Sequence, residues 1–212
     1  MFIGAIGVTA AVATAGRAEG GIAVFTDRNE FLAAVPRVRE IDFETLPDGS
    51  PSVFETLITP DFNYTSEGVT FSSPEPFLAI TGNAESGFNL RAGLFGSGGP
   101  RNWIIADLVE PAFAVGVLYP GGTILSAFEV GSGTLITQQL FAEGGDNRFG
   151  GIVSDRPIGS VILDRGLEVH AINSFFFSPI PEPASGVLLV LGALMLIRER
   201  ASRPVPVVAR SA

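Results

Sequence analysis

Histidine, serine and the carboxylates are the side chains that could take part in catalysis, but their spacing matches no catalytic arrangement. The sequence has one histidine, His170. Ser132 lies between two glycines, yet the outer glycines of a Gly-x-Ser-x-Gly nucleophile turn are absent around it. With 22 acidic residues, some pair will reach the separation of a glycosidase by chance. The sequence therefore favours a protein that is not an enzyme, with a secreted hydrolase as the less favoured alternative.

Any metal site in this chain would have to be built from oxygen ligands. One imidazole without cysteine cannot complete a zinc site, whereas Ca²⁺ takes carboxylate and carbonyl oxygens. Asp42 and Glu44 lie on the same face of a predicted strand, where they could contribute to such a site. A solvated acidic face is the interpretation that the sequence favours, so no cofactor is expected, and structural Ca²⁺ is the alternative.

Sugar rings are commonly bound on flat aromatic side chains, chiefly tryptophan and tyrosine. The chain has one tryptophan, Trp103, and two tyrosines, against 17 phenylalanines. The phenylalanines occupy alternating positions, as core residues of strands do, and Tyr119 shares such an apolar face. Trp103 is therefore the candidate carbohydrate contact. Asn63, with Tyr64 and Thr65, matches the N-glycosylation sequon, a pattern that is common by chance.

The charge of the chain argues against one class of partner. Its 212 residues carry a formal net charge of −9, and all 13 basic residues are arginines. An acidic chain with scattered arginines repels phosphates over most of its surface, so nucleic acid is excluded as a partner. The length is sufficient for one domain with a sizeable core once both ends are set aside.

The elements that must position these residues are one short helix and a series of strands. Asp27 and Glu30 have capping-box spacing and Pro36 ends the run, which predicts a helix over residues 27–35. Strands are predicted at 39–45, 68–71, 77–81, 102–108, 112–119, 124–130, 135–141, 149–153, 160–163 and 171–177. The glycine-rich residues 93–99 predict a flexible loop. Because no amphipathic helix lies between the strands, the sequence predicts an all-β fold, an antiparallel β-sandwich of jelly-roll type with one short N-terminal helix.

The N-terminal residues have the composition of an export signal. Residues 1–15 carry no charge and end in Ala13-Thr14-Ala15, the small-x-small pattern that signal peptidase accepts. The run is shorter than the roughly 20 residues that span a bilayer. We expect a signal peptide at 1–15 and therefore an exported protein; a buried N-terminal strand or helix is the alternative.

The C-terminal end combines a proline-flanked glutamate, an apolar run and a basic cluster. Pro181, Glu182 and Pro183 predict an extended spacer, because proline cannot continue a helix interior or a central strand. Residues 184–197 would be apolar on every side as a helix, as lipid contact requires. The arginines that follow place the end of the chain in the cytoplasm.

These segments give a predicted layout for the whole chain. It consists of a signal peptide at 1–15, an extracellular β-sandwich domain at 16–178, a C-terminal segment at 179–200 with a transmembrane helix at 184–197, and a disordered cytoplasmic tail at 201–212.

The order of the C-terminal elements resembles the PEP-CTERM sorting signal of Gram-negative bacteria. The matching residues are Pro181, Glu182 and Pro183, the apolar residues 184–197, and Arg198 and Arg200. The resemblance implies recognition by exosortase, a membrane transpeptidase that cleaves near the motif after transient anchoring in the inner membrane. These residues would be determinants of processing and not of catalysis. The tail at 201–212 extends beyond the point at which family members usually end.

The resemblance also implies a location and a class of function. It points to a non-enzymatic protein of the cell surface or extracellular matrix, associated with exopolysaccharide and biofilm. The spacing of the last predicted strands is similar to jelly-roll domains common in PEP-CTERM proteins, and related sandwiches include carbohydrate-binding modules. Many such modules hold a structural Ca²⁺ between their first and last strands, which would add Asn173 to Asp42 and Glu44. A lectin-like module, dependent on Ca²⁺, is therefore the alternative. The expected partners are exosortase, the membrane and extracellular polysaccharide.

Overall fold

A computed structural model gives the fold, and it describes residues 21–53, 55–75, 77–81, 93–97, 103–141, 148–164 and 170–180. The predicted signal peptide, sorting motif, transmembrane helix and tail lie outside these residues. Within the described part of the chain, no helix is long and apolar enough to span a membrane.

Helix α1 (Arg28–Ala34) forms where the capping pattern predicts it. The side chain of Asp27, at the N-cap, accepts a hydrogen bond from the backbone N–H of Glu30 at 2.9 Å. This bond satisfies one of the free donors of the first helical turn. The helix ends shortly before Pro36, which prevents a further turn. The helix predicted from the sequence is confirmed.

Most other described residues lie in strands, and all pairs of these described strands are antiparallel. The strands are β1 (Ile22–Phe25), β2 (Arg39–Ile41), β3 (Thr56–Leu57), β4 (Val69–Ser72), β5 (Phe77–Thr81), β6 (Gly93–Ser97), β7 (Ile104–Tyr119), β8 (Thr123–Glu129), β9 (Leu135–Phe141), β10 (Arg148–Asp164), β11 (His170–Ile172) and β12 (Ser174–Pro179), with a 3-10 helix, η1 (Tyr64–Glu67), before β4. One sheet has the order β2-β12-β7-β10-β8-β9, with β1 beside β10 and β4 beside β7, and a second has the order β11-β6-β5-β3. The predicted all-β, antiparallel class is confirmed.

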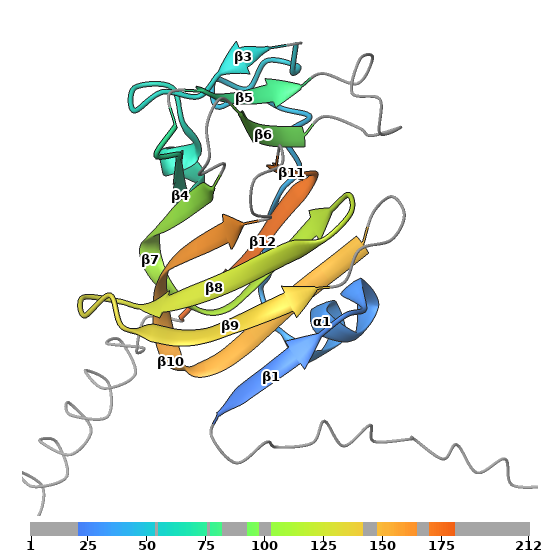
Figure 1. Ribbon diagram of the computed structural model, residues 1–212, viewed down its shortest axis with the longest axis vertical. Coiled ribbons are helices and arrows are strands. Elements are labelled where there is room, and N and C mark those ends of the chain that lie inside the picture. Colours follow the sequence, from blue (N-terminus) through green and yellow to red (C-terminus); the bar gives the residue numbers. More distant parts are fainter. Residues whose placement is uncertain are drawn as a thin grey trace, which may run out of the picture. The chain divides into compact units, whose positions relative to one another are not determined.

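The larger sheet is folded into two layers, because β7 and β10 are long enough to belong to both (Figure 1). The second half of β7 pairs with β12 and with the first half of β10, which itself pairs with β1. The first half of β7 pairs with β4, and the second half of β10 pairs with β8. The β7–β10 register shifts between Val153 and Ile158 and again before Ser160. Such irregularities let a strand bend, and the result is a β-sandwich.

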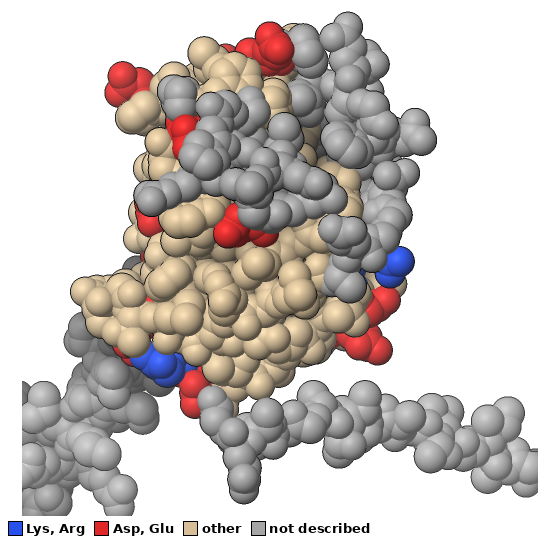
Figure 2. Space-filling model, in the orientation of Figure 1, with Lys and Arg blue, Asp and Glu red and all other residues tan. Residues whose placement is uncertain are grey.

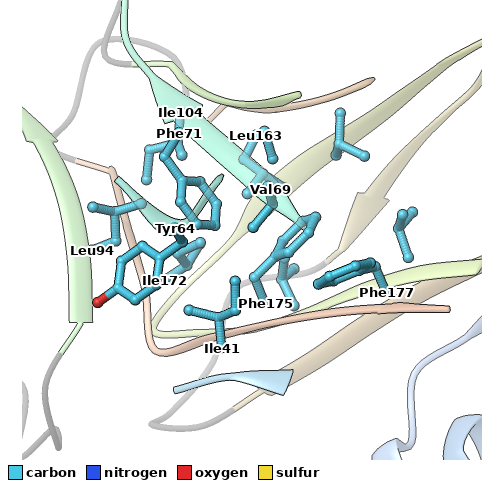
Figure 3. Close-up of a cluster of buried hydrophobic side chains, with 14 of the residues drawn as sticks. Ile41, Tyr64, Val69, Phe71, Leu94, Ile104, Leu163, Ile172, Phe175 and Phe177 are labelled. Atoms are coloured by element: carbon cyan, nitrogen blue, oxygen red, sulfur yellow. The ribbon is translucent and has the colours of Figure 1, made fainter. Parts of the chain in front are cut away.

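The two layers enclose one hydrophobic core, part of which is drawn in Figure 3. Near its centre, the ring of Phe71 packs edge-to-face against Phe43, Tyr64 and Phe175, with centroids 5.4, 6.0 and 5.5 Å away. Each such pair adds about 0.5–1.5 kcal/mol beyond the burial of its surface. The smaller sheet contributes Ile80, Leu94 and Ile172 to the same cluster. The core therefore joins both sheets.

Helix α1 covers the outer face of the layer that contains β12. A second hydrophobic cluster consists of Phe31, Val35, Ala114, Phe149 and Phe176. Phe176 belongs to this outer cluster, whereas its neighbours Phe175 and Phe177 belong to the main core. Because α1 lies on the outer face, β12 is buried on both sides and has no exposed polar positions between its phenylalanines.

Glycines in β7 and β10 make room for aromatic rings on both faces of the sheet. A Cβ atom on Gly150 would lie 2.6 Å from the ring of Phe141 in the main core. A Cβ atom on the next residue, Gly151, would lie 2.8 Å from the rings of both Phe31 and Phe149 in the outer cluster. Real Cβ atoms do not approach this closely, so the absence of a side chain is what allows the rings to pack here.

Two predicted strand pairs are single strands in the structure. The strands predicted at 102–108 and 112–119 are joined in β7, and those at 149–153 and 160–163 are joined in β10. Each long strand runs through a proline, Pro111 or Pro157, at the place where the register is irregular. Proline is tolerated in a strand at such bulges, so the strands continue where local sequence indicates an interruption.

Two other predictions are also corrected. The strand predicted at 171–177 is divided by Asn173 into β11 and β12, which belong to different sheets. The glycine-rich residues 93–99 are not a loop throughout, because Gly93 to Ser97 form β6 between β5 and β11. Pairing on both sides stabilises this strand despite its glycines. A Cβ atom on Gly93 would lie 2.9 Å from the carbonyl oxygen of Ile172, so glycine permits the close approach of β11.

Asn63, the sequon residue, has a structural role. Its Oδ1 accepts hydrogen bonds from the backbone N–H groups of Tyr64 at 3.0 Å and Phe71 at 2.8 Å. Its Nδ2 donates to the carbonyl oxygens of Phe71 at 2.7 Å and Thr59 at 3.3 Å. Because the amide is buried and fully used in this way, it is not available for glycosylation in the folded domain.

Candidate functional site

A polar pocket of about 780 Å³ lies where the start of α1 meets the ends of β2, β7, β10 and β12. The described residues that line it are Thr26, Asp27, Arg28, Asn29, Glu40, Asp42, Glu44, Leu118, Arg148, Phe149, Asn173 and Ser174. All but Leu118 and Phe149 are polar or charged. The pocket therefore offers many hydrogen-bonding groups and two apolar side chains.

Arg28, the first residue of α1, connects the helix to β2 at the pocket. Its Nη2 donates to Oε2 of Glu40 at 2.8 Å, and its guanidinium lies 5.1 Å from the centre of the Phe176 ring. The side chains of the ion pair are 42% and 35% exposed. A pair this exposed contributes only about 0–1 kcal/mol to stability. At the pocket it places a carboxylate and a guanidinium side by side.

Asp42 and Glu44 reach the pocket through a turn and not through a regular strand. β2 ends at Ile41, short of the predicted end at residue 45, because Phe43 has a φ of 58°. This left-handed conformation is rare for a bulky residue, and the fully buried ring of Phe43 accompanies it. The N–H of Glu44 donates to Oδ1 of Asp42 at 3.0 Å. The predicted inward position of Phe43 and outward position of the two carboxylates are correct, although the strand is shorter.

Asn173 approaches the pocket from the segment that passes between the two sheets. Its backbone N–H donates to the carbonyl of Leu118 at 2.7 Å, and its side chain is buried. Asp42, Glu44 and Asn173 therefore line one pocket. Among the residues that the structure describes, no group of three or more histidine, cysteine or carboxylate side chains is arranged to hold a metal ion. Calcium binding stays a prediction.

Carboxylates outnumber guanidinium groups in the described lining of the pocket. Its described lining has four carboxylates, on Asp27, Glu40, Asp42 and Glu44, against two guanidinium groups. Burial raises the pKa of the nearby Glu67 carboxyl, and the negative charge of Asp42 raises it further. An excess of carboxylates attracts cations and accepts hydrogen bonds from hydroxyl and ammonium groups, whereas it repels other anions.

The remaining candidates from the sequence lie apart from the described lining of the pocket. Trp103 immediately precedes β7, is half-buried and is not among the lining residues. His170 begins β11, with Gly96 opposite it in β6. Ser132 lies in the turn between β8 and β9, where its Oγ donates to Oε2 of Glu129 at 2.8 Å. The structure therefore does not bring the candidate serine to the carboxylates of the pocket.

Several lining residues were not identified from the sequence, and some of them had a detectable signal. Glu40, Asp42 and Glu44 alternate along the chain, so the pattern that selects the last two also includes Glu40. For Asp27 the sequence predicts only a role as a helix cap. No local signal could have selected Arg148, because it reaches the pocket only through the pairing of β10 with β7.

The sequence was also compared with known proteins. No protein-family model matches the chain, and no similar curated protein was found.

Proposed function

We propose that the chain is an exported, non-enzymatic protein of the cell surface or extracellular matrix of a Gram-negative bacterium. Its C-terminal segment is a PEP-CTERM signal, with Pro181, Glu182, Pro183, Arg198 and Arg200 read by exosortase. The β-sandwich is the part that remains after sorting, in contact with exopolysaccharide or biofilm components. The residues of the sorting motif are processing determinants.

The observation that carries this proposal is that the last described strand of the domain ends just before the motif. β12 ends at Pro179, opposite Ala112 of β7, and the Oγ of Ser178 donates to the carbonyl of Pro36 at 2.6 Å. Ile180 is already exposed. Since the last strand is complete before Pro181, cleavage at the motif would remove no strand and no core side chain of the described domain.

The jelly-roll assignment belongs to the same proposal. β2 near the start of the domain pairs with β12 at its end, and β1 pairs with β10. Pairing of early strands with late ones is expected of sandwiches that are built from Greek-key connections, of which the jelly roll is one.

Export and sorting can be tested by intact mass in a Gram-negative host that encodes an exosortase. We expect the protein in the envelope or medium to lack residues 1–15 and to end within the motif or the apolar run after it. Replacement of Pro181, Glu182 and Pro183 by alanine should leave the full C-terminus in place and retain the protein in the inner membrane.

A matched control replaces Pro204 and Pro206 in the tail by alanine, which should leave processing unchanged. Retention of both chain ends in the cytosolic fraction would contradict export. Equal processing of the motif variant and the control would contradict sorting by the motif.

A second candidate function is carbohydrate binding in the polar pocket. It is favoured by one observation, the convergence of Asp42, Glu44 and Asn173 with further polar side chains on a single depression. Carboxylates and amides bind sugar hydroxyls by hydrogen bonds, and Phe149 is the one aromatic residue in the described lining. The excess of carboxylates favours neutral or amino sugars over uronic acids.

This candidate can be tested on an array of neutral, amino and acidic glycans, with and without a calcium chelator. Asp42→Ala and Glu44→Gln should each weaken binding about tenfold, because a hydrogen bond to a charged group contributes about 1.5–3 kcal/mol. Asp61→Asn, an exposed carboxylate outside the pocket lining, is the control. Binding lost with Trp103→Ala but kept in both pocket variants would place the sugar site at Trp103 instead, and absence of saturable binding would refute the candidate.

A further inference from the structure

Strand β9 (Leu135–Phe141) is an edge strand with unusual exposure. It ends the path of the larger sheet, and β8 is its one partner among the described strands. The backbone groups on its other side are therefore not used in a described ladder. A row of such groups is a template for pairing with another strand.

The sequence of β9 lacks most features that protect sheet edges. Charged residues, proline and very short length are the usual protection. β9 has seven residues, Leu-Ile-Thr-Gln-Gln-Leu-Phe, with no charge and no proline. The other edges of the same sheet are shorter, with three residues in β2, two of them charged, and four in each of β1 and β4. Only the start of β9 is irregular, where the register with β8 shifts between Ala127 and Phe128.

Leu140 adds exposed apolar surface to this unprotected edge. It is 76% exposed, more than any other large hydrophobic residue that the structure describes, and Leu135 at the start of β9 is 47% exposed. Figure 2, in the orientation of Figure 1, shows no charged side chain on the surface formed by β9. The whole chain has a net charge of −9, so two copies repel each other over most contacts and least over this strand.

The regular part of β9 is complementary to itself. Thr137 to Phe141 follow β8 without interruption. If two copies pair antiparallel about Gln139, Gln138 of each lies opposite Leu140 of the other, and the two Leu140 side chains are diagonal neighbours within contact distance. Antiparallel pairing of one strand with its own copy has two-fold symmetry, so the contact closes after two chains.

We propose that β9 is a self-association edge, through which two copies of this chain pair antiparallel about Gln139 and continue their sheets into one another. The contact involves one short strand from each copy, which places it among small, transient interfaces. Association then depends on local protein concentration, and it becomes appreciable where many copies are held close together.

Disulfide cross-linking tests the edge directly, because the chain has no cysteine of its own. In Gln139→Cys, the two introduced thiols would lie opposite each other on the symmetry axis, with Cβ atoms about 4.5–5.5 Å apart, close to the separation of a disulfide. With the full chain in mild detergent and a mild oxidant, we expect this variant to form covalent dimers about tenfold faster than Leu57→Cys, although the control thiol on β3 is at a more exposed position than residue 139.

A second comparison separates pairing through β9 from chance collision or from contacts elsewhere. In the Gln139→Cys background, Leu140→Lys should slow cross-linking about tenfold, because it brings two like charges together across the edge. Val53→Lys, which adds the same charge at another exposed position, should have little effect. Since Leu140 is exposed, its replacement should leave the circular dichroism spectrum unchanged. Equal cross-linking at positions 139 and 57, or equal effects of the two lysine substitutions, would overturn the proposal.

Discussion

Replacement of Asn63 by alanine should lower the free energy of unfolding by about 3–4 kcal/mol, because it leaves buried backbone groups without partners. The amide of Asn63 bonds both the N–H and the carbonyl of Phe71, besides Tyr64 and Thr59. Each buried group that loses its partner costs about 1–3 kcal/mol. Urea unfolding followed by the fluorescence of Trp103, the one tryptophan, measures the change.

A control variant at this site identifies the cause. Ser66→Ala, at an exposed position of η1, should change stability by less than about 0.5 kcal/mol. A loss in Ser66→Ala as large as that in Asn63→Ala would mean that the effect comes from η1 as a whole and not from the amide of Asn63.

Replacement of Gly150 by alanine should cost about 2 kcal/mol, although alanine normally stabilises a strand relative to glycine. The added Cβ would lie 2.6 Å from the ring of Phe141, which is buried at the end of β9. Overpacking of this kind costs about 1–3 kcal/mol. The lower flexibility of the unfolded chain, once glycine is replaced, stabilises the folded protein by only about 0.4–1 kcal/mol. Thermal or urea unfolding gives the sign as well as the size of the effect.

A double-mutant cycle with Phe141→Leu assigns this cost to the contact. The smaller side chain leaves room for the new methyl group, so the double variant should be more stable than the sum of the single effects predicts, by at least about 0.5–1 kcal/mol. Strict additivity would mean that Gly150→Ala acts through the backbone of β10 and not through the ring.

The local pattern of the sequence predicts much of the fold. The capping pair Asp27 and Glu30 determines where α1 begins, and alternation of apolar residues identifies most strands. The local pattern does not show how far each strand continues. Pro111 and Pro157 lie inside β7 and β10. Each lies at a bend between the two layers, where the ladder is irregular and the missing N–H of proline breaks no regular hydrogen bond. The long shared strands are a property of the tertiary fold.

The candidate pocket was predictable in part for the same reason. Asp42 and Glu44 are near each other in sequence, so their common side follows from alternation alone. Arg148 and Asn173 join them only through long-range pairing of β10 and β12 with β7. The residues of the sorting motif depend on order along the chain and not on three-dimensional contacts. They stay predictions, since they lie outside the described residues.

The position of β12 determines how the domain responds to a pull from its C-terminal side. β12 lies between β2 and β7, and hydrogen bonds hold it along both edges. A tension applied beyond Pro179 acts along the strand, at right angles to these bonds, because antiparallel ladders run perpendicular to their strands. The bonds on both edges are then loaded together in shear and do not open one after another. Attached by this end, the domain would carry force through a strand that is buried on both faces.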